Sequence, residues 1–351
     1  ALGAERDPMT REAIRGVLEQ VSDDSRAATW LTAQELAVND DMLDLLDSAD
    51  GDGVAEPDAQ LVFCIDVRSE GLRRHIEAQG PYDTLGFAGF FGIPMQVEQL
   101  AWEHAEARCP VLVQPATQAI ERERPGHEIA LHRRLDLERS IGGGVAAHAG
   151  TKYGLGGPFV MAEAAGWFLG PVAAARTLLP HTSNPERPEG TIIELAGTDL
   201  EQRTYFAEAV LSTMGLTTGF APLVVLSGHG AHTVNNPHAT GLDCGACAGA
   251  AGDSNARTVV RLLNEPDVRA GLVERGIVVP DETVFVAAIH DTVSDRVDLL
   301  DLDDVPSSHA DRVTRLRAAL AEAGVRQSSD RSRHLPGPAS RVRERGADWA
   351  Q

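Results

Sequence analysis

The residues best suited to chemistry begin with a triplet that closes an apolar run. Gln60-Leu-Val-Phe-Cys-Ile-Asp66 has the composition of a buried strand, and Cys64, Asp66 and Arg68 occupy alternate positions at its end. Alternate positions of a strand share one face, so a thiol, a carboxylate and a guanidinium could meet there. Taken alone, the triplet favours an ordinary interpretation, a buried cysteine beside a surface ion pair.

A second group of residues, after another apolar run, changes that balance. Leu223-Val-Val-Leu-Ser227 precedes His229, and glycines on both sides of the histidine let the backbone turn sharply. Cys244 follows 15 residues later, far enough for a loop that returns to the site. Two thiolates and one imidazole suit tetrahedral Zn²⁺, and three protein ligands leave a fourth position open for catalysis. The two groups together predict zinc at Cys64, His229 and Cys244.

Other uses of the cysteines stay open at this point. Cys244 and Cys247 form a CxxC pair, which could be a redox dithiol or could add a fourth ligand to a closed structural zinc site. The sequence contains no second CxxC that would complete a four-cysteine site. Cys64 and Arg68 also match the bare spacing of a sulfatase nucleophile, but the Pro or Ser that helps to define that signature is missing. A structural-zinc or thiol redox-responsive protein is the main alternative.

Helices and strands alternate along the chain that must position these residues. The patterning predicts helices over 8–47, 69–78, 118–139 and 256–275, a short apolar segment over 85–91, and strands over 60–66, 111–113, 223–227 and 284–289. This alternation is typical of an α/β fold with a mainly parallel β-sheet flanked by helices. The apolar stretch 159–179 contains Glu163, Pro171 and Arg176, which favours a buried or interfacial helix over a membrane span.

Three regions are expected along the chain. A helical N-terminal segment with an acidic linker occupies 1–56, a zinc-binding domain occupies 57–298, and a helix with a polar, Arg-rich tail occupies 299–351. An alignment of the acidic linker with a calcium-binding loop fails, because Ala59 falls where a bidentate Glu should be. The linker is therefore expected to be a solvated connection.

Composition excludes several classes of function. The 351 residues are 43% hydrophobic, enough for a sizeable core, and 52 acidic against 31 basic residues give a net charge of -21. Such a balance argues against nucleic-acid binding and against attraction to anionic lipid. Four cysteines are too few for a disulfide scaffold of this size, and no signal peptide opens the sequence, so we expect a cytoplasmic compartment.

Several separate motifs, in order along the chain, resemble those of the DabA family, the zinc subunit of a two-component system that accumulates inorganic carbon. The matching segments are Cys64-Ile-Asp-Val-Arg-Ser-Glu70, Gly86-Phe-Ala-Gly-Phe-Phe-Gly92, Cys109-Pro-Val-Leu112, Gly228-His-Gly230, Asn235-Asn-Pro237, Gly241-Leu-Asp-Cys-Gly-Ala-Cys247 and Asn255-Ala-Arg257. The resemblance covers roughly 57–295, and family members are considerably longer than this chain. Together these motifs are far more specific than any one of them.

The resemblance implies a β-carbonic-anhydrase-like core in which Cys64, His229 and Cys244 ligate zinc. In such a core Asp66 and Arg68 form the catalytic dyad, and the zinc site hydrates CO₂ to bicarbonate. The family also implies a partner, an integral membrane, proton-conducting subunit (DabB-like), whose ion flux makes hydration effectively one-way. We therefore expect a peripheral protein at the cytoplasmic face of the cell membrane, active with that partner. The step from His229 to Cys244 is longer than in ordinary β-carbonic anhydrases.

Further hypotheses concern the neighbourhood of this site. If Arg68 released Asp66, the carboxylate could reach the metal and block the open position. Asp243 and His232 are candidates for hydrogen bonds to the ligands or for proton transfer. An apolar wall for CO₂, with ordinary core packing as the alternative, would come from Phe87, Phe90 and Phe91.

Overall fold

A computed structural model describes most of the chain. The described residues are 8–48, 56–100, 105–127, 190–233 and 238–334, with the isolated positions 167, 170, 171, 174 and 236. The chain divides into two compact units, Ala1–Ala55 and Glu56–Gln351. The predictions for 49–55, for most of 159–179 and for the tail beyond 334 lie outside the described residues. No helix in the described ranges is long and apolar enough to cross a membrane.

The described part of the first unit, residues 8–48, consists of two helices, which confirms the helical prediction for 8–47. They are α1 (Pro8–Gln20) and α2 (Asp23–Ser48). Asp23 and Asp24 lie in the first turn of α2, where negative charge stabilises the positive end of the helix dipole.

A five-stranded sheet forms the centre of the second unit. Its strands are β1 (Ala59–Cys64), β2 (Tyr82–Phe87), β7 (Leu223–Gly230), β8 (Val284–Asp291) and β9 (Arg296–Leu300). They lie in the order β2-β1-β7-β8-β9, and all neighbours are parallel except β8 and β9. Every residue of β1 and β7 is buried, as expected for central strands covered on both faces. The mixed α/β class with a mainly parallel sheet is thus confirmed.

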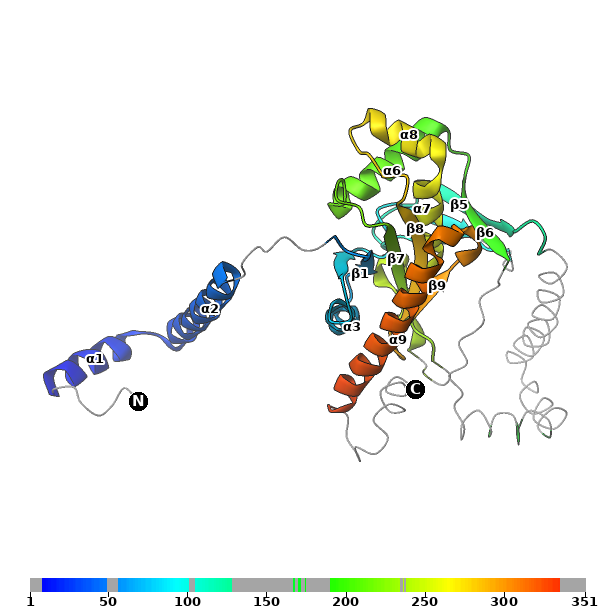
Figure 1. Ribbon diagram of the computed structural model, residues 1–351. Coiled ribbons are helices and arrows are strands. Elements are labelled where there is room, and N and C mark those ends of the chain that lie inside the picture. The colour runs from blue at the N-terminus through cyan, green and yellow to red at the C-terminus, as the bar shows by residue number, and fades with distance from the viewer. Residues whose placement is uncertain are drawn as a thin grey trace. The chain divides into compact units, whose positions relative to one another are not determined.

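Helices cover both faces of this sheet (Figure 1). On one face lie α3 (Val67–Glu77) and α9 (Ala310–Ser332), which pack apolar side chains such as Leu72 and Leu316 against Phe63. On the other face lie α6 (Leu200–Met214), α7 (Asp253–Asn264) and α8 (Pro266–Glu274). The predicted helix over 256–275 is therefore present but broken, because Pro266 keeps the preceding Glu265 out of the helical conformation.

A second sheet packs into the same core beside α7. Its strands are β3 (Met95–Glu98), β4 (Ala105–Ala107), β5 (Thr117–Glu123) and β6 (Thr191–Ala196), in the order β4-β3-β5-β6. Short 3₁₀ turns complete the described chain: η1 (Ala239–Gly241), η2 (Gly245–Cys247), η3 (Leu302–Asp304) and η4 (Ser307–His309). Met95, Val97, Ala119 and Ile193 join the core that α6 and α7 also form.

Two secondary-structure predictions are wrong where the structure describes them. The segment 118–123 is part of β5 rather than a helix. Its charged residues do not all face solvent, since buried Glu121 forms an ion pair with Arg257 of α7. The segment 111–113 is a turn rather than a strand, closed by the Val113 N–H, which donates to the Pro110 carbonyl. Leu112 in that turn is 98% exposed, so this short apolar run lies at the surface and is not a buried strand.

The connections that follow β1 and β7 run toward opposite edges of the sheet. The connection from β1 through α3 runs to β2 on one side, and that from β7 through α7 and α8 runs to β8 on the other. Because α3 and α7 lie on opposite faces, the carboxyl ends of β1 and β7 form the topological switch point of the sheet. Ligands of open α/β sheets bind at such a switch point, and Cys64 and His229 lie there.

Candidate metal centre

Two of the three predicted ligands are placed by neighbouring strand ends. Cys64 is the last residue of β1, and His229 is the second-last residue of β7. The sequence suggested that His229 follows its strand, but the strand continues through Gly230 because His229 pairs in register with His290 of β8. The imidazole is therefore held by a sheet strand rather than by a loop, which gives it a fixed position.

Cys244 reaches the strand ends because the loop after β7 folds back on itself. Its N–H donates to the Ala250 carbonyl at 3.2 Å, and the Gly252 N–H donates to the His229 carbonyl at 2.9 Å. Gly228 and Gly252 pack backbone against backbone, since a Cβ on Gly228 would lie 2.3 Å from the Gly252 carbonyl oxygen. This close approach requires residues without side chains.

The three ligand atoms form one compact, buried cluster. The Sγ atoms of Cys64 and Cys244 are 3.7 Å apart, and both lie within 4.8 Å of a ring nitrogen of His229. Cys64 is 3% exposed, Cys244 0% and His229 2%. Two sulfurs that each lie about 2.3 Å from a tetrahedral Zn²⁺ are separated by about 3.8 Å. The observed spacing of the sulfurs fits a shared metal ion and is far too long for a disulfide.

Gly89 closes one side of this cluster with its backbone. Its backbone N–H favours the ionised form of Cys64 and so lowers the pKa of that thiol, against the larger effects that raise it. A Cβ at this position would lie 2.7 Å from the Cys244 sulfur and 2.8 Å from the Cys64 sulfur, closer than real Cβ contacts. The two sulfurs thus sit in a cradle that only glycine permits. The half-buried Phe90 packs against the same sulfurs.

The thiols of the cluster influence one another strongly. The contact with Cys244, together with burial, raises the pKa of the Cys64 thiol and that of Cys247. Hydrogen bonds from Cys247 and Cys64, with a further contribution from His229, lower the pKa of Cys244. Without a cation, neighbouring thiolates repel one another, so the negative charge concentrates on Cys244. A bound divalent cation reverses this repulsion and deprotonates the thiols that coordinate it.

The remaining cysteines differ in their relation to the centre. Cys247 is buried in the sulfur cluster and contacts Cys244, but it is not among the three residues whose ligand atoms lie within 4.8 Å of one another. Cys109 is buried elsewhere and donates to the Val113 carbonyl at 3.4 Å. Of the two, only Cys247 can compete for a role at the centre.

Asp66 and Arg68 form a two-pronged ion pair beside the cluster. Nε of Arg68 donates to Oδ1 of Asp66 at 2.7 Å, and Nη2 donates to Oδ2 at 2.8 Å. The pair faces Nε2 of His229, which lies 3.6 Å from Oδ2 of Asp66 and 3.5 Å from Nη2 of Arg68. Burial opposes the charge of Asp66, but the contacts with Arg68 prevail and hold its pKa below the usual value.

Asp66 and Arg68 lie close together, as predicted, but they do not share the face of a strand. The strand ends at Cys64, and Asp66 is the N-cap of α3, where its Oδ1 accepts a hydrogen bond from the Arg68 N–H at 2.9 Å. The carboxylate and the guanidinium meet because a cap residue and the second residue of a helix lie together. Alternation along a strand is not the reason.

Some candidates lie near the centre and others do not. Of the three phenylalanines, only Phe90 packs against the sulfurs, because Phe91 is fully buried in the main core and Phe87 stacks on it at 6.4 Å. Asp243 accepts a hydrogen bond from the Ala231 N–H at 2.8 Å, so it supports the loop that follows His229. Its role in proton transfer, and that of His232, stay predictions.

Two residues with a bearing on the centre were missed from the sequence. Gly89 lies within a quoted motif, but its contact with sulfurs on β1 and on a distant loop depends on the fold. His290 lies at the end of β8, and its Nδ1 is 3.1 Å from Ser69 Oγ. The sequence did offer one signal for His290: like His229, it follows an apolar run.

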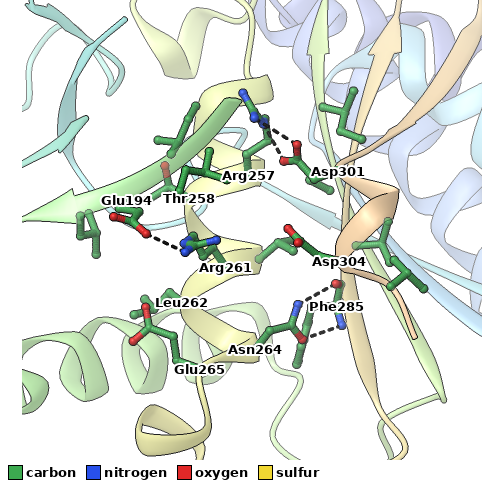
Figure 2. Close-up of a pocket in the computed structure, with 18 of the residues that line it drawn as sticks. Glu194, Arg257, Thr258, Arg261, Leu262, Asn264, Glu265, Phe285, Asp301 and Asp304 are labelled. Atoms are coloured by element: carbon green, nitrogen blue, oxygen red, sulfur yellow. Dashed lines mark hydrogen bonds and ion pairs between the residues drawn. The ribbon is translucent and has the colours of Figure 1, made fainter. Parts of the chain in front are cut away.

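A cavity of about 490 Å³ lies apart from this centre, among α7, β6, β8 and the turn η3. Figure 2 shows that charged side chains of its lining pair with one another: Arg257 with Asp301, and Arg261 with Glu194. These ion pairs give the cavity a charge-balanced lining that holds α7 to β6 and η3. The Cys64, His229 and Cys244 cluster therefore remains the candidate site.

Comparisons with known proteins match the chain to one family. A family model described as "Probable inorganic carbon transporter subunit DabA" matches residues 6–351. A relative of that name from Salinibacter ruber is 38% identical over 364 residues, covering 92% of this chain and 44% of the relative. "Probable inorganic carbon transporter subunit DabA2" from Halothiobacillus neapolitanus is 42% identical, covering 84% of this chain and 37% of the relative. The chain thus spans less than half the length of these relatives. No solved structure matches it.

Proposed function

This chain belongs to the DabA family, and from that premise we propose that it binds Zn²⁺ and hydrates CO₂ to bicarbonate for an inorganic carbon transporter. The observation that carries the proposal is the buried cluster of Cys64, His229 and Cys244 at the sheet switch point. Two sulfurs and one nitrogen suit zinc, and a catalytic zinc site uses three protein ligands. Zinc, when bound, supplies a Lewis acid that makes hydroxide available from water near neutral pH.

Asp66 is the group proposed to orient the attacking water. Its pKa lies below the usual value, so the carboxylate stays ionised and accepts a hydrogen bond from water at neutral pH. Arg68 binds both carboxylate oxygens, which fixes their orientation beside the His229 ring. In this proposal Arg68 holds the site open, and loss of its grip lets Asp66 block the fourth position.

Phe90 is proposed to provide the apolar surface for CO₂. It packs against the cluster of Cys64, Cys244 and Cys247 and is only half-buried. Because CO₂ carries no net charge, an apolar surface favours its binding and also keeps bulk water away. Phe87 and Phe91 belong to the core and are assigned no such role.

The wider setting of the reaction is part of the same proposal. The relatives are named as subunits of an inorganic carbon transporter, which supports a membrane partner that conducts protons and removes the product of hydration. We place the chain at the cytoplasmic face of the membrane, bound peripherally to that DabB-like partner. We further propose that the sheet around the switch point is the β-carbonic-anhydrase-like core.

One alternative draws on a specific observation, the burial of Cys247 against Cys244. If Cys247 were a fourth ligand, the site would be closed and structural. The function is tested by measuring CO₂ hydration with the zinc-loaded protein and its partner, comparing the natural chain with Asp66→Asn. We expect the variant to keep its zinc and to lose at least tenfold in rate. An unchanged rate would overturn the proposed role of Asp66, and no hydration by the natural chain would overturn the function.

A further inference from the structure

A buried polar side chain on β8 contacts the helix that carries Arg68. His290 is in register with His229 of the neighbouring strand, and its side chain is fully buried. Its Nδ1 lies 3.1 Å from Oγ of Ser69, in the first turn of α3. Its Nε2 is 3.8 Å from Oδ1 of Asp295 and has no hydrogen-bond partner in the described chain. His290 thus lies between α3 and a buried carboxylate.

Asp295 is in turn fixed by α9. Arg331 pairs with its Oδ1, and the Ser328 hydroxyl donates to its Oδ2 at 3.0 Å. The backbone of Asp295 has φ 57°, uncommon for a residue with a side chain, and a Cβ on Gly324 would lie 2.5 Å from its carbonyl oxygen. The loop that carries Asp295 is therefore held tightly against α9. A carboxylate that faces Nε2 favours the proton there, which leaves Nδ1 of His290 to accept from Ser69.

Serine, histidine and aspartate in contact invite comparison with a hydrolytic triad. A nucleophilic serine must be reachable by its substrate, yet Ser69 is only 1% exposed. The cavity of about 600 Å³ beside Asp295 and Ser328 is not lined by Ser69 or His290. The burial of the serine points to a structural contact within the fold rather than to a nucleophile.

The contact is close to the dyad along the chain. The Ser69 N–H donates to the Asp66 carbonyl at 2.9 Å, and the Arg68 N–H donates to Oδ1 of Asp66 at the same distance. The first turn of α3 therefore joins three residues: the cap Asp66, the guanidinium that holds it, and Ser69. An anchor on Ser69 restrains the turn as a whole, because helix ends fray unless they are held.

We propose that His290 is a positioning residue: by binding Ser69 it fixes the first turn of α3, and so holds Asp66 and Arg68 against His229. The proposal rests on the proposed function for its consequence, but its structural content does not depend on zinc. Asp295 acts behind His290 by orienting its ring. The ligands Cys64 and His229 are set by β1 and β7, so weakening this anchor disturbs the dyad and leaves metal binding in place.

Hydrogen exchange of the metal-free protein tests the anchor directly. Ser69→Ala and His290→Leu are each expected to raise the exchange rate of the amides over 66–70 by about tenfold, the effect of losing one net hydrogen bond. His290→Asn places an amide oxygen near the position of Nδ1 and is expected to restore slow exchange. The last turn of α3, residues 74–77, serves as the internal control. Unchanged exchange in both disruptive variants overturns the proposal.

Zinc content and CO₂ hydration by the loaded protein with its partner separate this inference from the proposed function. We expect His290→Leu and Ser69→Ala to retain zinc and to lower kcat several-fold, with rescue by His290→Asn. Faster exchange together with normal kcat would overturn the link to the dyad. If the natural protein hydrates no CO₂, the proposed function fails, whereas the exchange result still decides the anchor. If His290→Leu does not fold, Ser69→Ala decides alone.

Discussion

Replacing Gly89 by alanine tests the cradle of the metal centre with a single methyl group. The added Cβ would lie 2.7 Å from the Cys244 sulfur and 2.8 Å from the Cys64 sulfur. Ordinary contacts of a Cβ begin at 3.4 Å, so one or both cysteines, or the backbone of Gly89, must move by at least roughly 0.6 Å. Metal sites tolerate ligand displacements of only about 0.2 Å.

The size of the effect follows from the cost of overpacking. Inserting a methyl group into a closely packed site costs about 1–3 kcal/mol, which corresponds to a loss of roughly 5-fold to 150-fold in zinc affinity if the apo protein relaxes and the loaded protein cannot. The assay is competition for zinc against a chromophoric chelator, which reports the dissociation constant of the protein.

A matched control is available beside one of the same cysteines. Gly245 adjoins Cys244 in sequence, yet a Cβ there meets no atom within 4 Å, so Gly245→Ala is expected to bind zinc as the natural chain does. If Gly89→Ala keeps the natural zinc affinity, the cradle has no bearing on the metal and the reasoning is refuted. If Gly245→Ala weakens binding as much as Gly89→Ala, the effect is not specific to the sulfur contacts.

Other parts of the structure give predictions of different kinds. Cys247→Ser is expected to retain one zinc per chain by metal analysis, whereas loss as complete as in Cys64→Ser would favour the closed site. The hydrogen bond from Arg124 lowers the pKa of Asp304, so this pair stabilises the fold above the unfolded-state pKa and the contribution is lost as the pH falls through the folded-state pKa. Because Asp304 is half exposed, we expect Arg124→Gln to cost no more than about 1 kcal/mol at pH 7 in urea unfolding, with the difference vanishing in acid; a difference that grows in acid would contradict this. Arg257→Met leaves two carboxylates without their buried guanidinium and is expected to cost about 3–5 kcal/mol in the same assay, and a cost below 1 kcal/mol would show that the ion pairs along α7 contribute little.

The sequence was a good guide to the central strands and to the two candidate ligands at their ends. Cys64 and His229 each close a short, continuous apolar run, which is the pattern of a parallel strand buried on both faces. Strand ends of a parallel sheet meet at one edge, so the meeting of these two residues follows from pattern alone. The return of Cys244 was expected only because glycines and loop length allowed it.

Local geometry at the same site was harder to predict. Asp66 and Arg68 were expected to share a strand face, but the strand stops at Cys64 and the residues meet through the cap of α3. Element boundaries depend on single backbone angles, which composition does not determine. In the same way Glu121 was assigned to a charged helix, because its partner Arg257 lies far away in sequence and the pairing that buries both is tertiary.

Contacts that depend on the fold could not be predicted at all. Gly89 and His290 each touch the centre or its supporting helix from a distant segment, and neither residue type announces such a role. A glycine in a loop is usually a turn residue, and a histidine after an apolar run is often a core residue with satisfied hydrogen bonds. The contact of Gly89 with the two sulfurs and that of His290 with Ser69 are seen only in the folded structure.

The absorption spectrum of the cobalt-substituted protein, recorded with and without azide, tests the central claim most directly. Three protein ligands and an open position predict one Co²⁺ per chain, bands typical of a tetrahedral site with two thiolates, and a shift of those bands when azide enters the open position. Loss of the bands in Cys64→Ser would assign them to this site. A spectrum with three thiolates that azide does not change, or no cobalt bound, would contradict the claim that Cys64, His229 and Cys244 form a catalytic metal centre.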